Sequence, residues 1–295
     1  MAIPSTLCVG IDLDDLRYYR GIHALPPAED TPVVFEAAVP RFLALCERVG
    51  LRATLFAISA DMHWHAARDV LGRAARDGHE VASHSRSHFY DLSRKDPRRI
   101  EAEVAGSRGD LQDALGVPVV GFRGPGYNLT PALLSVLHAS GFRYDASILP
   151  SPAYWAARAA IIAAMRVAGR RSASITGRFR DFWRGRRPFT WGPPAPGLKE
   201  YPITACGPAR LPLIGTTLTR PSPMRDHLVW FARRLPFVHV EFHAIDFLDI
   251  AQDGLDPALA VEPALGVPLA VREASFEQVL RTLAAGRRTP VLAAL

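Results

Sequence analysis

Cysteine is scarce in this sequence, and the few cysteines form no pattern. Cys8, Cys46 and Cys206 are odd in number, widely spaced and without a C-x-x-C pair. Such an arrangement supplies neither a disulfide framework nor a four-cysteine metal site. We therefore expect three buried, reduced thiols.

Long apolar runs are absent as well. The sequence has no stretch of about 18 uncharged apolar residues, so no membrane-spanning helix is expected. Residues 1–10 lack a basic region that leads into an apolar run and a small-residue cleavage site. We identify no secretory signal here and expect a cytoplasmic protein.

The remaining composition is that of a globular protein. Of the 295 residues, 48% are hydrophobic and 22% are charged. A chain of this length can bury one large core, and single α/β barrels often reach this size. We expect a single domain that spans residues 1–295.

Hydrophobic spacing predicts alternating strands and helices. The expected strands cover residues 7–11, 53–58, 79–83, 119–122, 144–147, 201–204, 237–242 and 290–292. The expected helices cover residues 35–49, 66–77, 97–115, 131–140, 153–167 and 275–285. Such alternation is typical of βαβ units, so we expect an α/β fold with a parallel sheet.

Positive charge is concentrated in one segment. Residues 151–190 contain nine arginines and a single acid, Asp181, so this segment carries +8 and the rest of the chain carries −2. Residues 151–198 begin with an Ala-rich helical stretch and end in a Pro-rich run, which marks them as an insertion. The arginines suit phosphate-bearing partners such as anionic lipid, whereas no nucleic-acid module supports nucleic-acid binding.

Two groups of residues whose side chains can bind a metal ion follow predicted strands. Asp12, Asp14 and Asp15 end the first strand, and acids packed this closely repel one another unless a cation lies between them. His84 and His88 follow the third strand, and on a helical turn their spacing places both imidazoles on one side. Two histidines and a carboxylate can hold one metal ion and leave positions open for water and substrate. Taken singly, the motifs also fit a solvated acidic turn and a surface histidine pair.

Two further motifs follow later strands. Arg123 can hold a carboxylate in its ionised form by a bidentate bond, and the glycines and proline beside it form a turn that could aim a backbone N–H into a pocket. His243, with Asp246 three residues later, suits a general acid. The alternatives are a structural salt bridge and a structural histidine. All four motifs fall at predicted carboxyl ends of strands, where barrel folds build active sites.

The order and form of these motifs resemble the polysaccharide deacetylase family, carbohydrate esterase family four. The matching segments are Asp12–Asp15, Ala53–Phe56, Gly78–His88, Gly121–Tyr127, Gly141–Ser147, Glu200–Ile203 and Phe242–His243. The resemblance implies a distorted (β/α)7 barrel, of the NodB-like kind, that carries the basic insertion.

The resemblance also implies a metal site. Asp14, His84 and His88 would bind a divalent ion, most often Zn²⁺, with Co²⁺, Ni²⁺ or Fe²⁺ as alternatives. The third aspartate leaves a second assignment open, in which Asp14 is the base and Asp15 is the ligand.

The other roles are likewise implied by the resemblance. Asp12 would be the general base, Arg123 would orient it, and His243 would be the general acid. The backbone N–H of Gly126 or Tyr127 would stabilise the oxyanion. The family's Asp-Trp motif, which tunes the acidic histidine, is missing here, and Asp246 or Asp249 could replace it.

These features predict a cytoplasmic, metal-dependent N-deacylase, either a deacetylase or a deformylase. Its substrate would be an amino sugar in a glycolipid, polysaccharide or cell-envelope precursor. The basic segment 151–190 could bring the protein to the inner membrane and to a lipid-linked substrate. The alternatives are allantoinase-like hydrolysis of a non-sugar amide and a catalytically inactive carbohydrate-binding protein.

Overall fold

The computed structural model describes residues 5–177 and 179–295. Its main sheet has eight strands in the order β10-β1-β2-β3-β4-β5-β7-β6. All neighbours are parallel except β6, which joins the edge antiparallel to β7. The strands are β1 (Thr6–Asp12), β2 (Thr54–Ala57), β3 (Glu80–Ser83), β4 (Gly121–Phe122), β5 (Tyr144–Asp145), β6 (Phe189–Thr190), β7 (Lys199–Glu200) and β10 (Phe237–His243), with a separate hairpin of β8 (Ala205–Cys206) and β9 (Leu211–Pro212).

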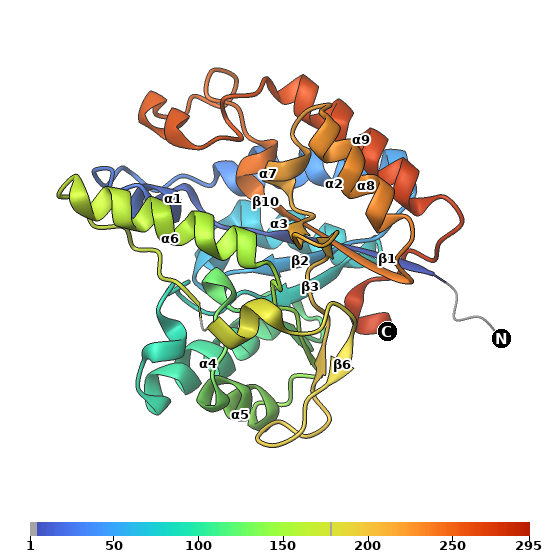
Figure 1. Cartoon of the computed structure of the whole chain (residues 1–295). Helices are drawn as coiled ribbons and strands as arrows, with labels where there is room; N and C mark the ends of the chain where they lie inside the picture. The colour runs from blue at the N-terminus through green and yellow to red at the C-terminus, as the bar shows by residue number, and fades with distance from the viewer. Residues whose placement is uncertain (1–4, 178) are drawn as a thin grey trace.

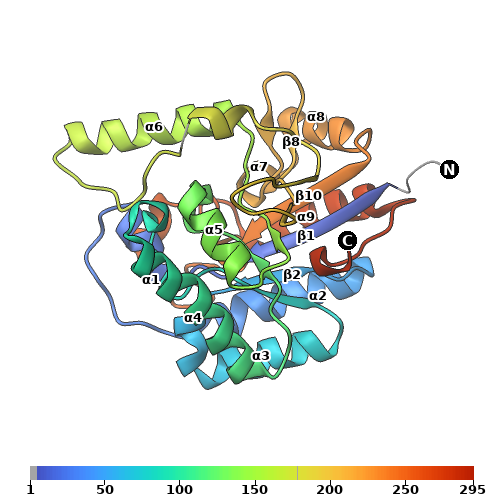
Figure 2. The ribbon, with the colours of Figure 1, turned by 90° about the horizontal axis from the view of Figure 1, so that it is seen from below.

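The sheet curls, and helices pack against its outer face (Figures 1 and 2). The α-helices are α1 (Leu16–Ile22), α2 (Val39–Val49), α3 (His65–Arg76), α4 (Pro97–Leu115), α5 (Pro131–Ala139), α6 (Pro152–Val167), α7 (Gly215–Leu218), α8 (Pro223–Ala232) and α9 (Leu269–Ala284). The shorter turns are η1 (Val34–Ala38), η2 (Ser59–His63), η3 (Leu92–Arg94), η4 (Pro125–Tyr127), η5 (Phe179–Trp183), η6 (Ala244–Phe247), η7 (Pro257–Val261) and η8 (Leu292–Ala294). Seven parallel strands with helices outside confirm the predicted distorted (β/α)7 barrel.

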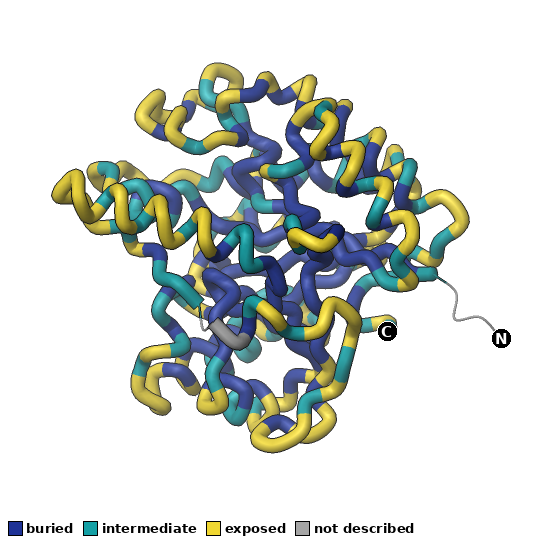
Figure 3. The backbone as a smooth tube through the Cα atoms, viewed as in Figure 1, coloured by how far each residue is buried: buried dark blue, intermediate teal, exposed yellow. Residues whose placement is uncertain are grey.

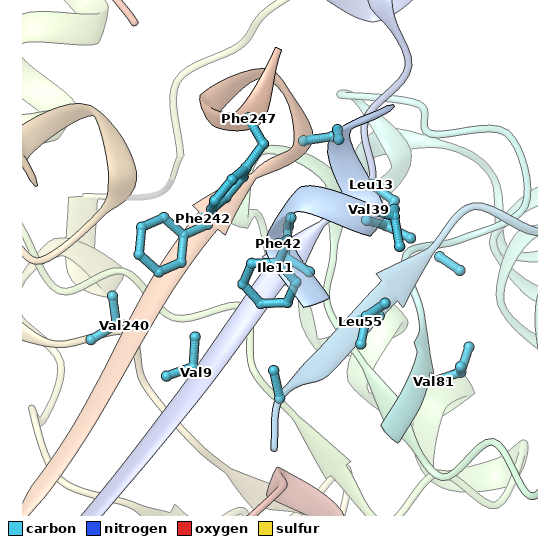
Figure 4. Close-up of a cluster of buried hydrophobic side chains, with 14 of the residues drawn as sticks. Val9, Ile11, Leu13, Val39, Phe42, Leu55, Val81, Val240, Phe242 and Phe247 are labelled. Atoms are coloured by element: carbon cyan, nitrogen blue, oxygen red, sulfur yellow. The ribbon is translucent and has the colours of Figure 1, made fainter. Parts of the chain in front are cut away.

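Side chains alternate between two cores along each strand, because successive strand residues point to opposite faces. Val9 and Ile11 of β1 pack outward against α2, together with neighbours from β2, β3 and β10 (Figure 4). Cys8 and Phe56 face the inside of the curl and join a smaller buried cluster. The same alternation turns Asp12 toward the inside, which places a carboxylate at the carboxyl end of the curled sheet.

Local sequence explains most helix boundaries. Gly50 and Gly116 end α2 and α4 in the left-handed conformation, with φ of 76° and 66°. The predicted helix over residues 35–49 begins instead as the π-helical turn η1 and continues as α2. Pro40 lacks the N–H that an α-helix would donate one turn back, so the wider turn before it is expected.

Two predicted strands are wrong. The strand expected at residues 201–204 is β7 at Lys199–Glu200, where it pairs with β5. Pro202 has no N–H to continue the ladder, so the chain leaves the sheet there. Residues 290–292 were also expected to be a strand, but they lead into the turn η8.

The basic insertion contributes α6, η5 and β6. Only Trp155 of α6 is buried, and the helix stands on the side of the sheet toward which β1 runs, opposite the chain ends (Figures 1, 2 and 3). Arg178, one of the nine arginines, lies outside the described residues. Over residues 5–177 and 179–295, no helix combines the length and apolarity that crossing a bilayer requires.

Candidate metal and catalytic site

Two histidines meet one aspartate where β1 and β3 end. The Nε2 atoms of His84 and His88 each lie 3.2 Å from the same oxygen, Oδ1 of Asp14. All three side chains are buried. Their candidate ligand atoms lie within 4.8 Å of one another, which suits a single ion.

The loop from His84 to His88 fixes how the imidazoles point. His84 Nδ1 donates to the backbone oxygen of Arg123 at 2.8 Å, so its Nε2 is the nitrogen left for a metal. The predicted helical turn is wrong, because Ser85 and His88 adopt left-handed conformations with φ of 67° and 51°. Ser85 Oγ accepts the backbone N–H of His88 and closes this turn. The rings of Tyr18 and Tyr90 flank His88 at centroid distances of 4.3 and 4.7 Å.

The chemistry of this cluster fits a cation. Asp14 Oδ1 and both ring nitrogens of His88 are buried and have no hydrogen-bond partner among the described residues. Burial without a partner costs free energy, which a shared metal ion would offset. Burial acts to raise the pKa of Asp14, but His88 and His84 outweigh it and hold that pKa well below its usual value. The carboxylate is therefore ionised and ready to act as a ligand.

Asp15 has a different task from its neighbour. It is the N-cap of α1, where its Oδ1 accepts the backbone N–H of Arg17 at 3.0 Å. Its carboxylate is absent from the group formed by Asp14, His84 and His88. This geometry favours Asp14 over Asp15 as the metal ligand.

Arg123 holds Asp12 in the floor of the site. The guanidinium is fully buried, and its Nη1 donates to Asp12 Oδ1 at 2.5 Å. Its Nε donates to the backbone oxygen of Ala146, and its Cζ lies 3.9 Å from the ring centre of Phe56. Burial acts to raise the pKa of Asp12, but Arg123 above all lowers it below the usual value. Asp12 is thus kept ionised, and its Oδ2 lies 3.7 Å from His84 Nε2.

His239 completes the hold on Arg123, and the sequence motifs did not identify it. Its Nδ1 donates to the backbone oxygen of Tyr201 at 3.1 Å, so its Nε2 is free to accept from Arg123 Nη2 at 2.9 Å. Burial, reinforced by Arg123, lowers the pKa of His239 to about 3. The ring is neutral and acts as an acceptor.

Glu241 is a second residue that the motifs missed. It is fully buried, and neither carboxylate oxygen accepts a hydrogen bond from a described residue. Its Oε1 lies 3.6 Å from Arg123 Nη1, and Asp12, Glu241 and His243 form a second cluster with atoms within 4.8 Å. Burial, with Asp12 nearby, raises the pKa of Glu241 to about 8. The signal was present in the sequence, because residues 239 and 241 share one face of the strand predicted over 237–242, and residue 243 continues that face.

His243 ends β10 directly beside Asp12, with which it pairs in the sheet. Its Nε2 lies 3.3 Å from the hydroxyl of Tyr127. Burial acts to lower the pKa of His243, but the surrounding acids, with Glu241 the strongest, raise it to about 9. The imidazole is therefore protonated at neutral pH, as a general acid requires.

Asp246 supports His243 through the backbone. Its Oδ2 accepts the backbone N–H of His243 at 2.9 Å. Asp249 accepts the N–H groups of Ala251 and Gln252 in the following turn. Neither acid is hydrogen-bonded to the imidazole, and Glu241 is the first of the carboxylates that raise its pKa.

The two predicted oxyanion donors lie in the turn after β4. Gly126 and Tyr127 both have positive φ, of 64° and 63°. The backbone N–H of Tyr127 already donates to Gly124 at 3.1 Å, so this predicted donor is in use. Gly126 lines the site and is the better candidate of the two, while Tyr127 offers its hydroxyl.

A pocket of about 280 Å³ opens over these groups. Asp12, Asp14, His84 and His243 line it, together with Gly126 and Tyr127. The walls include residues of α1, α6 and the segment around 262–264. The structure thus brings the predicted base, the predicted acid and two of the three predicted ligands to one cavity, with His88 directly behind them.

Comparison with known proteins agrees with this picture. Residues 28–144 match the family model described as polysaccharide deacetylase, which confirms the resemblance carried by the motifs. His84, His88, Arg123, Gly126 and Tyr127 fall inside the matched range. No curated protein matches the chain.

Several solved structures share the fold. A candidate polysaccharide deacetylase from Mycobacterium smegmatis has a TM-score of 0.61 at 15% identity, covering 99% of this chain and 89% of its own. The Puue allantoinase has a TM-score of 0.59 at 13% identity, with 98% and 88% covered. The Bc1960 peptidoglycan N-acetylglucosamine deacetylase has a TM-score of 0.50 at 11% identity, with 98% and 86% covered. At these identities the likeness establishes the barrel and leaves the activity to the site itself.

Proposed function

Because residues 28–144 match the polysaccharide deacetylase family, we propose that this chain is a metal-dependent N-deacylase of an amino sugar. The observation that carries the proposal is the approach of two imidazole Nε2 atoms to Asp14 Oδ1, each at 3.2 Å. A two-histidine, one-carboxylate set leaves ligand positions open for water and an amide oxygen. Such an open site can support amide hydrolysis, and the family match favours that reaction.

Asp14, His84 and His88 would hold the ion, and zinc is the first choice for this donor set, with Co²⁺, Ni²⁺ or Fe²⁺ as alternatives. When bound, a divalent cation supplies Lewis acidity that polarises an amide carbonyl and lowers the pKa of water. The fit rests on the buried atoms of Asp14 and His88 that have no hydrogen-bond partner among the described residues.

The remaining chemistry belongs to the chain's own side chains. Asp12 Oδ1 is occupied by Arg123, so Oδ2 is the atom that would accept a proton from the attacking water. His243 would then donate a proton to the departing nitrogen, which avoids expulsion of an amide anion. The hydroxyl of Tyr127 and the N–H of Gly126 lie at the same cavity and would orient the carbonyl.

A substrate panel tests this proposal. The zinc-loaded protein should release amine from N-acetyl or N-formyl amino sugars, and chelation should abolish the release until zinc is restored. Turnover of allantoin without turnover of any sugar amide would favour the allantoinase-like alternative. Bound metal with no turnover of any amide would favour the inactive carbohydrate-binding alternative.

We also propose that the basic insertion contacts an anionic membrane from the cytoplasmic side and that the substrate is lipid-linked. Support comes from α6, whose Ile161 and Val167 are 56% and 90% exposed. Exposed arginines 166, 170 and 171 follow at its end, and apolar and cationic groups side by side suit an anionic lipid surface.

Vesicle co-sedimentation tests the membrane proposal. The wild type should pellet with phosphatidylglycerol vesicles and less with phosphatidylcholine vesicles. The double substitution Val167→Asp with Arg171→Glu should weaken pelleting with phosphatidylglycerol vesicles. Val271→Asp, on the exposed part of α9, should not. Equal pelleting of all three proteins would rule out α6 as the contact.

A further inference from the structure

The catalytic pocket has two zones of different chemistry. The inner zone holds Asp12, Asp14 and His243, and two buried tyrosines, Tyr19 and Tyr90, line the same cavity. The hydroxyls of both tyrosines have no hydrogen-bond partner within the part of the chain that the structure describes. Buried hydroxyls without partners favour a ligand that offers polar groups, as a sugar does.

The outer zone is largely apolar: of the polar residues that also line the cavity, His23 is paired with Glu262 and Arg158 with Ser174. Ile214 and Ile245 are buried beside the catalytic residues: Ile214 forms a bridge with Glu241, and Ile245 follows His243 by two residues. Ile22 and Ile162 line the cavity farther out, and Ile161 lines it while remaining 56% exposed to solvent. These isoleucines come from α1, α6, the residue before α7 and the turn η6, and together they form an apolar wall that reaches the surface at α6.

Such a wall suits an alkyl chain better than it suits further sugar units of a polysaccharide. A carbohydrate polymer that continued past the reacting unit would place its hydroxyls against isoleucines, which offer no hydrogen bonds. An alkyl chain in the same place would release water from apolar surface on both sides. The exposed end of the wall is also the place at which α6 presents Ile161 to solvent.

We propose that the outer pocket, formed by Ile22, Ile161, Ile162, Ile214 and Ile245, binds an alkyl chain carried by the amino-sugar substrate. The inference rests on the proposed deacylase function and narrows its substrate to an amphiphile. Two attachment points of the alkyl chain share this chemistry. The alkyl chain is bound to the anomeric oxygen of the sugar, or it belongs to the acyl group of the amide.

Binding and turnover together test the proposal. Octyl β-glucoside, kept below its micelle concentration, contains the chain but no amide, and calorimetry should detect its binding to the wild type. Octyl N-acetylglucosaminide should show a KM about tenfold below that of the methyl glycoside, because several methylenes become buried. N-octanoylglucosamine, compared with N-acetylglucosamine, tests the other attachment.

Ile161→Asn and Ile162→Asn should each remove most of the octyl preference, and Val271→Asn should leave it unchanged. Ile161 and Val271 are both exposed, so neither substitution should unfold the protein. An equal KM for methyl and octyl substrates at both attachments, with no binding of octyl glucoside, would overturn the proposal. If no amide is hydrolysed, the deacylase function fails, and calorimetry with the Ile161 variant still decides whether the pocket binds a chain.

Discussion

Glu241 and His243 lie on the same face of β10 and bring a carboxylate and an imidazole together beside Asp12. The pKa of His243 is raised to about 9, with Glu241 the strongest of the acids that oppose burial. A general acid works only while protonated, so activity should fall as pH rises through this pKa. Glu241 is therefore expected to extend activity toward alkaline pH.

Glu241→Gln tests this relationship. Glu241 is ionised above its pKa of about 8, and removing that charge lowers the pKa of His243, so the alkaline limb of the kcat profile should move to lower pH. At pH 9 the variant should lose about three- to tenfold more activity than at pH 6.5. Any shift that a bound metal causes is common to both proteins. A parallel loss of activity at every pH would show that Glu241 is only structural.

Gly215 lies against the carboxylate of Asp246, which leaves no room for a larger residue at position 215. A Cβ at this residue would lie 1.8 Å from Oδ2 of Asp246, the atom that accepts the backbone N–H of His243. Gly215→Ala should therefore displace Asp246, cost about 1–3 kcal/mol of unfolding free energy, and lower kcat. Denaturant unfolding and steady-state kinetics measure the two effects.

Gly109 provides the matched control for Gly215. It lies inside α4 with nothing within 4 Å of an added Cβ. Gly109→Ala should leave kcat unchanged and stabilise the protein by about 0.5–1 kcal/mol, because alanine is the better helix former. Equal effects of the two substitutions would contradict the proposed contact.

The three cysteines should be unreactive in the folded protein. Cys8, Cys46 and Cys206 are free and buried, as the sequence predicted. Burial raises the pKa of all three thiols, that of Cys206 to about 12, so the thiolate is rare at neutral pH. A thiol reagent at pH 8 should label none of the three cysteines in the folded protein and all three after unfolding in guanidinium. Rapid native labelling would show that one of these sites opens.

Sequence patterns were sufficient for the parts of the fold in which local signals are strong. Helix α4 begins at Pro97 and ends before Gly116, as its proline and glycine predicted. Strands β4, β5 and β7 have only two residues each, and tertiary pairing sets where they lie. This is why the strand expected at residues 201–204 was misplaced.

The same limit applies to the site. The spacing of His84 and His88 identified a pair, but the left-handed Ser85 and His88 that orient it depend on contacts with other segments. The motif at the end of their strand pointed to His243 and Asp246 and left His239 and Glu241 unassigned. Polar residues at alternate positions of a buried strand are the pattern that would have revealed them.

The assignment of the metal ligand can be decided with two neighbouring aspartates. Asp14 Oδ1 lies 3.2 Å from both Nε2 atoms, whereas Asp15 caps α1 through the N–H of Arg17. Asp14→Asn should weaken zinc binding by at least about 100-fold, since a charged ligand is lost. Zinc at 100 times its Kd should stabilise the wild type by about 2.7 kcal/mol and the variant by far less.

Asp15→Asn is the matched control, because asparagine is also a good N-cap and the substitution removes the same charge. It should keep metal content and activity, while Asp15→Ala should cost about 1 kcal/mol of stability and still bind zinc. Metal content by mass spectrometry and melting with and without zinc distinguish these outcomes. Zinc loss in Asp15→Asn with retention in Asp14→Asn would reverse the assignment, and it would require the first turn of α1 to rearrange when metal binds.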